Sequence, residues 1–384
     1  MKPIQIVYFD AGGGHRSAAQ ALQQALDLPA ERVELVHLGQ LLAPLDVAQR
    51  WFGISMEEAY NRILDRGWTL GAGQTVYLLQ AIIRHYQPQI EATLETFWRT
   101  RPPCLVVSVV PHFNPALGAA LRRVCPGTPF VVVITDLADP RPSFWLTGRP
   151  DLVVCGTPRA VEQAHAAGRS DQEILATSGM MLHPRFYEPL EVDRETECVA
   201  LGLDPRTPTG LVLFGGQGSK AMLEIHDSVD ALGENVQLLY LCGHNSALQA
   251  ALQARPSRHR KWVHGFTTRI PFYMRLADFF IGKPGPGSVS EAVHMGLPVV
   301  VACNAWTLPQ ERYNAQWIRD NGLGLVVRHF RQVGTAVATL LQEGALERFR
   351  HNTRQHDNRA VFEVARAVRP LAEAGAARAD RNGP

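Results

Sequence analysis

Lysine is rare in this chain, and the basic and acidic residues are nearly equal in number. The 38 basic residues of the 384-residue sequence include 4 lysines, and 36 acidic residues leave a formal net charge of +2. A charge this close to balance gives no argument for a nucleic-acid partner. Lys220 and Lys283 both stand in glycine-rich segments, where a compact ammonium group on a flexible stem can reach a phosphate.

Several other features are missing from the sequence. It has no uninterrupted apolar run of about 18 residues, so no membrane-spanning helix is expected, and its first apolar run is too short for a signal peptide. The 6 cysteines lack CxxC spacing, which favours free thiols in a reducing compartment. The histidines form no HExxH pattern, and Asp136 and Asp139 are not spaced as a DxD motif. We therefore expect neither a metal ion nor another cofactor.

Apolar runs of strand length alternate with amphipathic segments along most of the chain, which is typical of an α/β fold. The strands are expected at residues 4–9, 33–37, 104–110, 130–135, 152–154, 174–177, 210–214, 236–242, 262–264, 279–281, 299–302 and 324–327. A polar, turn-rich stretch at residues 189–208 divides these runs into two sets. The pattern predicts two facing, doubly wound, Rossmann-like domains with a central cleft.

The same pattern gives the domain boundaries. Residues 1–190 form the N-terminal domain and residues 191–345 the C-terminal domain. Residues 346–371 are expected to be helical and could pack back on the first domain. Residues 372–384 are rich in alanine, arginine and glycine without an apolar stripe, so a disordered tail is expected.

The most informative segment covers residues 279–314 and reads FFIGKPGPGSVSEAVHMGLPVVVACNAWTLPQERYN. It predicts a strand, a glycine-rich turn and a helix beginning near Ser288. Gly285 and Gly287 let the backbone come close to a ligand, and the free N–H groups of the helix form an anion site. Glu291 lies one turn into that helix. In open α/β sheets ligands bind beyond the carboxyl ends of the strands, where this turn lies, although an ordinary strand–helix connection is the alternative.

A second segment, LVLFGGQGSKAM at residues 211–222, repeats the order of strand, glycine-rich turn and helix. Its possible phosphate donors are the backbone amides of Gly215, Gly216, Gln217 and Gly218 and the side chains of Ser219 and Lys220. LCGHN, with Gly243 and Asn245, and VHGF, with Gly265 and Phe266, follow in the same domain. One such loop is weak evidence, but the combination is specific for a nucleotide site.

The first predicted strand ends in FDAGGGH, where three glycines and His15 open a helix without the Lys-Ser/Thr ending of a phosphate-binding P-loop. A histidine there can take a proton near neutral pH, or it can simply cap its own helix. Asp136 follows another strand, in VVVITDLADP. It could orient His15, accept a proton itself, or cap the next segment.

Together these motifs resemble glycosyltransferase family 28, which includes the monogalactosyldiacylglycerol synthases and the diacylglycerol glucosyltransferases. The resemblance covers about residues 1–345. The lipid-galactosyltransferase version has Lys-Ala-Gly-Pro-Gly and Gly-Gln-Glu, where this chain has Pro284 for the alanine and Pro309 for the glycine. Both departures fall in the loop that would contact the sugar. Trp145 matches a family tryptophan, whereas Arg141 stands where the family has a histidine.

The resemblance implies a GT-B-type fold and an inverting transfer of a hexose from UDP-galactose or UDP-glucose to a lipid hydroxyl, with diacylglycerol as the expected acceptor. The implied catalytic residues are His15 and Asp136. Donor binding would involve Gly215, Gly216, Gln217, Gly218, Ser219, Lys220, Gly243, Asn245, Gly265, Phe266, Lys283, Gly285, Gly287, Ser288, Glu291, Gln310, Glu311 and Asn314. The lipid acceptor would contact Gly13, Gly14, Trp51, Phe52, Trp68 and Trp145.

Residues 44–87 mix aromatic side chains with arginines, which suits a membrane interface. The alternative is a set of helices with Trp51, Phe52 and Trp68 in the core. The family resemblance favours the membrane. It implies a cytoplasmic protein bound peripherally to the inner, anionic face of the cell membrane.

Two other functions remain open at this point. A UDP-sugar epimerase of the same architecture would release UDP or an epimer without an acceptor. A non-catalytic lipid- or nucleotide-binding protein is the second alternative. The joint presence of His15, Asp136, Glu291 and Gln310 argues against it.

Overall fold

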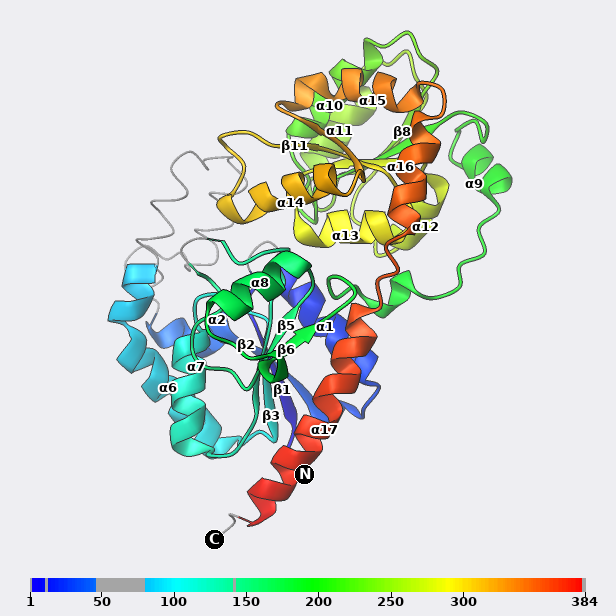
Figure 1. Ribbon diagram of the computed structural model, residues 1–384. Coiled ribbons are helices and arrows are strands. Elements are labelled where there is room, and N and C mark those ends of the chain that lie inside the picture. Colours follow the sequence, from blue (N-terminus) through cyan, green and yellow to red (C-terminus); the bar gives the residue numbers. More distant parts are fainter. Residues whose placement is uncertain (1, 11–12, 46–79, 141–142, 382–384) are drawn as a thin grey trace. The chain divides into compact units, whose positions relative to one another are not determined.

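The computed structural model describes residues 2–10, 13–45, 80–140 and 143–381. Within these residues the strands form two six-stranded sheets, in which the paired strands are parallel (Figure 1). The chain divides into two compact units. We call Met1–Pro184, Leu308–Gln310 and Asn358–Pro384 the N-terminal unit, and Arg185–Thr307 and Glu311–Asp357 the C-terminal unit. The α/β, doubly wound architecture predicted from the sequence is confirmed.

The sheet of the N-terminal unit has the strand order β2-β1-β3-β4-β5-β6. Its strands are β1 (Ile4–Tyr8), β2 (Val33–His37), β3 (Leu105–Ser108), β4 (Phe130–Val133), β5 (Leu152–Cys155) and β6 (Ile174–Ala176). Residues on β3 and β4 are buried without exception, because helices cover both faces of the sheet. A continuous apolar run therefore forms a strand here, with no alternation of polar residues.

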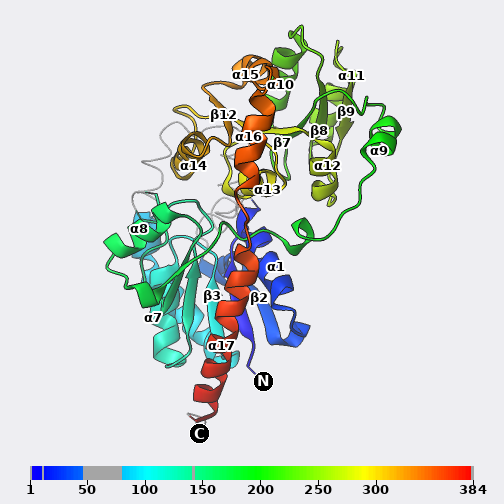
Figure 2. The same cartoon turned by 45° about the vertical axis from the view of Figure 1, so that its right-hand side comes forward.

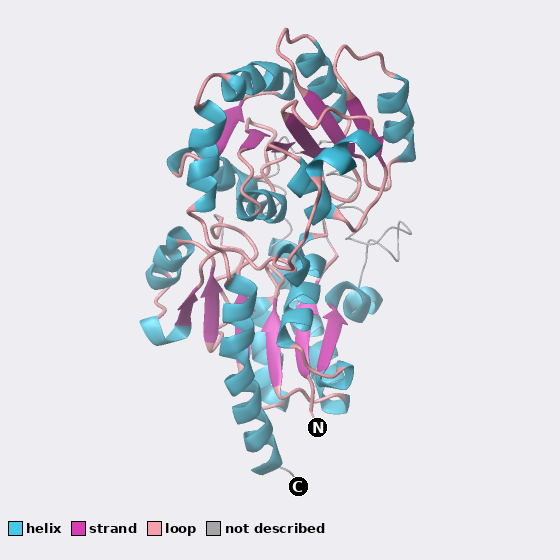
Figure 3. Cartoon of the chain, turned by 90° about the vertical axis from the view of Figure 1, so that its right-hand side faces the viewer, coloured by secondary structure: helices cyan, strands magenta, loops and turns pink. Residues whose placement is uncertain are grey.

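The helices of the N-terminal unit are α1 (Gly14–Leu26), α2 (Leu38–Leu42), α6 (Gln87–Thr100), α7 (Asn114–Val124), α8 (Pro158–Ala166) and α17 (Ala360–Arg381). Short 3-10 turns lie at Ala30–Arg32, Ala43–Leu45, Asp171–Glu173 and Pro184–Phe186. Helices α1 and α17 supply one core with the sheet, and α2, α6, α7 and α8 supply the core on the other face. Figure 3 shows the strands between these helix layers.

The C-terminal helix α17 lies beside α1 and closes one face of the N-terminal sheet (Figures 1 and 2). It continues to Arg381. The composition predicted a disordered tail from residue 372, but the chain is helical from there to Arg381. The helix can continue because Ala372 is buried and Gly375 lies directly on the carbonyl oxygen of Cys104. Small residues thus form a packing surface on this part of the helix without a stripe of large apolar side chains.

The sheet of the C-terminal unit has the order β12-β11-β10-β7-β8-β9. Its strands are β7 (Thr209–Leu213), β8 (Gln237–Leu241), β9 (Lys261–His264), β10 (Phe279–Gly282), β11 (Val299–Ala302) and β12 (Gly324–Val327). Its helices are α9 (Arg194–Ala200), α10 (Ala221–Asp230), α11 (Ser246–Ala254), α12 (Ile270–Leu276), α13 (Pro286–His294), α14 (Pro309–Asp320), α15 (Val333–Leu341) and α16 (Ala345–Arg354), with a 3-10 turn at Phe330–Gln332. Helices α10, α11 and α15 bury their apolar residues against β7, β8 and β10.

The described helices include none that is both long and apolar enough to cross a membrane. Most of the aromatic segment at residues 44–87, including Trp51, Phe52 and Trp68, lies outside the described residues. Arg141 lies outside them as well.

The close packing of α17 can be tested with Gly375→Ala. The added methyl group would meet the Cys104 carbonyl oxygen, so the helix would have to shift. We expect the free energy of unfolding of the N-terminal unit to fall by at least about 1 kcal/mol, since overpacking outweighs the better helix propensity of alanine.

Gly233→Ala is the control, because a methyl group there meets no atom within 4 Å. Thermal melting and hydrogen exchange of the β3 amides report the difference. Equal stability of the two variants would show that α17 does not pack closely at Gly375.

Candidate functional site

His15 lies at the carboxyl edge of the N-terminal sheet, in the first turn of α1. Gly13 precedes it with a φ of 77°, a conformation that glycine adopts without strain. The Nδ1 atom of His15 lies 3.0 Å from the hydroxyl oxygen of Thr135. Burial lowers the pKa of His15 to about 4, although a backbone contact with Val109 and the charge of Asp10 oppose the shift. The ring is therefore neutral at pH 7 and can accept a proton.

Asp136 follows β4 and is 8% exposed. Its Oδ2 atom accepts a hydrogen bond of 2.8 Å from the indole Nε1 of Trp145. Trp145 is fully buried, and the centre of its ring lies 5.9 Å from that of His15. Although the sequence placed Trp145 among the acceptor contacts, the structure places it beneath the surface, where it orients Asp136.

The Asp139 carboxylate organises the loop that carries Trp145. It is 4% exposed and accepts hydrogen bonds from the backbone amides of Phe144 (2.7 Å), Trp145 (3.2 Å) and Leu146 (3.4 Å) and from the Ser143 hydroxyl. Burial raises the pKa of Asp139, and these hydrogen bonds oppose the increase.

His112 is a further polar residue at this edge, and it was not among the site residues expected from the sequence. It follows β3, which pairs with β1, and burial together with the charge of His15 lowers its pKa to about 4. The signal available in the sequence was its place just after an apolar strand run, which is the same signal that pointed to Asp136.

In the C-terminal unit, the predicted donor-binding residues follow β7, β8, β9, β10 and β11 and so share the carboxyl edge of one sheet. The loops after β7 and β8 touch each other. The His244 amide donates to the Gly216 carbonyl (2.8 Å), and a side chain at Gly243 would collide with that carbonyl. The space beside Gly215 and Gly216 is open, which leaves room for a ligand.

The polar side chains of these two loops differ in whether they are left to bind a ligand. Lys220 is exposed at the start of α10, whereas Ser219 accepts the Ala221 amide through its hydroxyl (3.2 Å). Asn245 caps α11 by accepting the Leu248 amide at 2.9 Å, so its NH2 group is the part left to meet a ligand.

An exposed aromatic pair lies at the same edge. The rings of His244 and Phe266 stack with centres 4.1 Å apart and planes 16° from parallel. Phe266 is 53% exposed, so the pair presents a flat apolar surface. The sequence identified Phe266 but missed His244, which stands between two of the predicted residues.

The turn after β10 is tied to the start of α14. The Lys283 ammonium lies 3.4 Å from Glu311 Oε1, and the Asn314 amide donates to the Pro284 carbonyl at 2.7 Å. Helix α13 begins at Pro286, slightly earlier than predicted, because proline is favoured in a first turn. Asn314 is fully buried and braces the turn through its bond to Pro284.

Glu291 lies within α13 and is half-buried. Burial raises the pKa of its carboxyl to about 7, although the charge of Arg185 opposes the increase. A carboxyl that changes charge near pH 7 is rare outside functional sites, and this shift marks Glu291 as a ligand-binding candidate.

Among the described residues, no three or more histidine, cysteine, aspartate or glutamate side chains are grouped to hold a metal ion.

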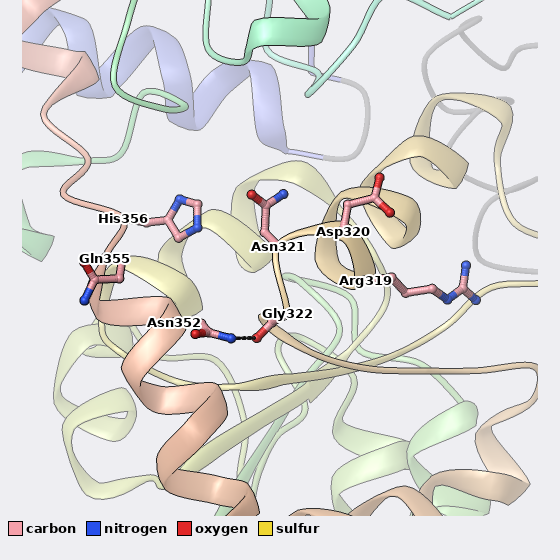
Figure 4. A pocket seen from close by; sticks show the side chains of 7 residues that line it. All are labelled: Arg319, Asp320, Asn321, Gly322, Asn352, Gln355 and His356. Atoms are coloured by element: carbon pink, nitrogen blue, oxygen red, sulfur yellow. Dashed lines mark hydrogen bonds between the residues drawn. The ribbon is translucent and has the colours of Figure 1, made fainter.

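A shallow polar hollow of about 420 Å³ opens at the end of α14, near Asn321 and His356 (Figure 4). It lies at the opposite end of α14 from Glu311, and two of its lining residues are joined by a hydrogen bond from Asn352 to the Gly322 carbonyl (2.9 Å).

The role of Asp139 can be tested with Asp139→Asn. In the wild-type protein the Phe144 amide donates to one carboxylate oxygen and the Leu146 amide to the other. Asparagine has a single acceptor oxygen, so one of these hydrogen bonds is lost. We expect the free energy of unfolding to fall by about 2 kcal/mol, since a charged acceptor of several buried donors is lost. Urea denaturation measures the change.

Asp151→Asn is the matched control, because the exposed Asp151 accepts one backbone bond, from Phe130 at 2.7 Å, which asparagine can also accept. Equal stability of the two variants would show that Asp139 does not stabilise the loop that carries Trp145.

Known proteins resemble this chain over nearly its whole length. Residues 210–369 match the family model of the glycosyltransferase family 28 C-terminal domain. A probable monogalactosyldiacylglycerol synthase 3 of Oryza sativa subsp. japonica is 27% identical over 96% of this chain and 74% of its own. Monogalactosyldiacylglycerol synthase 3 of Arabidopsis thaliana is 26% identical over 97% of this chain and 82% of its own.

Solved structures support the fold. Acinetobacter baumannii MurG superposes with a TM-score of 0.64 at 15% identity, covering 96% of this chain and 99% of MurG. CalG4, the calicheamicin glycosyltransferase, gives 0.58 at 16% identity over all of both chains. The chain is therefore a GT-B-type, UDP-sugar-dependent glycosyltransferase with a family 28 C-terminal domain, and it is similar along nearly its whole length to the monogalactosyldiacylglycerol synthases.

Proposed function

We propose that the protein transfers a hexose from UDP-galactose or UDP-glucose to the free hydroxyl of diacylglycerol, with inversion at the anomeric carbon. The lipid acceptor is suggested by the monogalactosyldiacylglycerol synthases among its relatives. The observation that carries the chemistry is His15, an imidazole kept neutral at pH 7 by burial, at the carboxyl edge of a sheet.

In the proposed reaction, the acceptor oxygen attacks the anomeric carbon while the bond from that carbon to the diphosphate oxygen breaks. The acceptor hydroxyl loses its proton to His15. A base with a pKa of about 4 is weak, so it takes the proton late, when bond formation has made the attacking hydroxyl acidic. The charge of Asp10 favours the imidazolium. Asp136, held by Trp145, is proposed to stabilise it further.

The departing diphosphate needs stabilisation on the donor side. The amides around Gly215 and Gly216, the exposed Lys220 and the ammonium of Lys283 are the proposed donors, without a catalytic metal or cofactor. Gln310 and Glu311 are the proposed contacts of the hexose, and the Phe266 surface is the proposed contact of the uracil.

A diacylglycerol acceptor requires contact with a bilayer, since exposing each CH₂ group to water costs about 0.8 kcal/mol. We place the reaction at the inner, anionic face of the cell membrane. The aromatic residues Trp51, Phe52 and Trp68 are the proposed membrane contacts, together with Gly13 and Gly14 beside the acceptor.

The deciding experiment incubates the protein with UDP-galactose, UDP-glucose or UDP-N-acetylglucosamine and with vesicles that contain diacylglycerol, ceramide or an isoprenoid alcohol. Mass spectrometry identifies the products, and NMR identifies the anomeric configuration. We expect a β-linked hexosyl diacylglycerol. An epimerised UDP-sugar in the absence of vesicles would indicate an epimerase, and no turnover of any UDP-sugar would indicate a binding protein.

His15→Ala should separate chemistry from donor binding. The predicted kcat falls by roughly 10²–10⁴, the usual contribution of a general base, while UDP affinity is unchanged. Calorimetry with UDP and a glycolipid assay measure the two effects. His165→Ala, on the exposed surface, is the control. Near-normal turnover of His15→Ala would leave Asp136 as the candidate base.

Glu291 predicts a pH dependence of donor binding. Hydroxyl groups of a ribose donate to an ionised carboxylate, so UDP should bind the ionised form better. Because the pKa of Glu291 is raised to about 7, UDP affinity should decrease as the pH falls below about 7.

Calorimetry from pH 5.5 to 8.5, covering roughly the range of one titration, measures this effect. Glu291→Gln supplies the reference, because the phosphate of UDP itself titrates near pH 6 and contributes equally to both proteins. Parallel pH profiles of the two proteins would place Glu291 outside the nucleotide site.

A further inference from the structure

His112 has an unusual backbone conformation that the surrounding loop maintains. Its φ is 68°, in the left-handed region that a residue with a side chain rarely adopts. The His112 amide donates to the Phe144 carbonyl at 2.7 Å, and its ring packs against the Phe144 ring at a tilt of 53°, with ring centres 4.2 Å apart. Such conformations persist where neighbouring contacts enforce them, and they occur often at functional sites.

The side chain of Gln80 determines which nitrogen of His112 carries the proton. Gln80 Nε2 lies 3.0 Å from the Ser143 carbonyl oxygen and 3.2 Å from His112 Nδ1. A carbonyl oxygen can only accept, so the group that faces it must be the amide NH2. The second hydrogen of this NH2 group then points to His112 Nδ1, which must be the accepting nitrogen. The neutral ring therefore carries its proton on Nε2.

His112 lies at the same sheet edge as His15. β3, which precedes His112, pairs with β1, which precedes His15, and the two rings are close enough for the charge of one to disfavour protonation of the other. The nearby carboxylates are already engaged, because Asp136 accepts from Trp145 and Asp139 holds the loop of Phe144. Two neutral imidazoles at one edge can hold one hydroxyl group, since one ring can accept its proton while the other donates to its oxygen.

We propose that His112 is a second acceptor-binding residue, which donates its Nε2–H to the oxygen of the acceptor hydroxyl and so directs the hydroxyl proton toward His15. The inference rests on the proposed function for the identity of the acceptor. It makes the acceptor subsite selective for an oxygen that can both accept and donate a hydrogen bond. Gln80 is a positioning residue, because it acts through the tautomer of His112.

The first test is independent of activity. Nitrogen-15 NMR of the histidine-labelled full chain at pH 7 should show His112 protonated on Nε2 and bare on Nδ1. Gln80→Leu should allow the other tautomer to appear. A His112 ring protonated on Nδ1 in the wild-type protein would overturn the proposal, whatever the enzyme transfers.

The second test compares His112→Asn with His112→Gln. Asparagine tolerates the left-handed backbone but does not extend to the Nε2 position, whereas the glutamine amide can extend to it. With vesicles containing dioleoylglycerol, His112→Asn should lower kcat/KM for the acceptor by about 10- to 100-fold, the loss of one well-placed hydrogen bond to substrate. His112→Gln should recover most of this loss.

Two controls separate this result from a structural effect and from failure of the proposed function. UDP affinity should be unchanged in His112→Asn. Equal losses in the asparagine and glutamine variants, or a loss of UDP affinity, would overturn the proposal. A wild-type protein that glycosylates no dioleoylglycerol would instead contradict the proposed function, and the NMR result would still decide the tautomer of His112.

Discussion

The buried carboxylate of Asp139 is the constraint on which the N-terminal site depends. One side chain accepts three successive backbone amides and thereby determines the path of residues 143–146. That path places Ser143 against Gln80, Phe144 against His112 and Trp145 between Asp136 and His15. Burying a carboxylate is costly, and the cost is offset because each oxygen receives hydrogen bonds.

A second constraint is the parallel sheet itself. When all strands run in one direction, every loop that follows a strand reaches the same edge. In the C-terminal unit this places the turns after β7, β8 and β10 at one edge of the sheet. The close contact of Gly243 with Gly216 and the ion pair of Lys283 with Glu311 then fix the spacing of these turns.

Burial has opposite effects on the two titrating groups that matter most. It removes water from both, which disfavours the charged form of each. The pKa of His15 therefore falls to about 4 and that of Glu291 rises to about 7. The same cause leaves the histidine ready to accept a proton and leaves the carboxyl sensitive to pH in the physiological range.

The sequence alone determined the two-sheet architecture, because uninterrupted apolar runs such as those of β3, β4 and β11 have a stable place only between two helix layers. It also located the glycine-rich turns, since their residue types and spacing are local properties. The helical end of the chain was not predicted from the sequence. Gly375 packs there because it has no side chain, and its neighbour, the Cys104 carbonyl, is far away in sequence.

The tertiary structure decided the chemistry of the individual groups. The burial of Trp145, the tautomer of His112 and the pKa values of His15 and Glu291 depend on neighbours from distant segments, such as Gln80 for His112 and Arg185 for Glu291. A sequence motif identifies which group can take part in a reaction. Its charge and its orientation follow from desolvation and from hydrogen bonds that form only when the chain has folded.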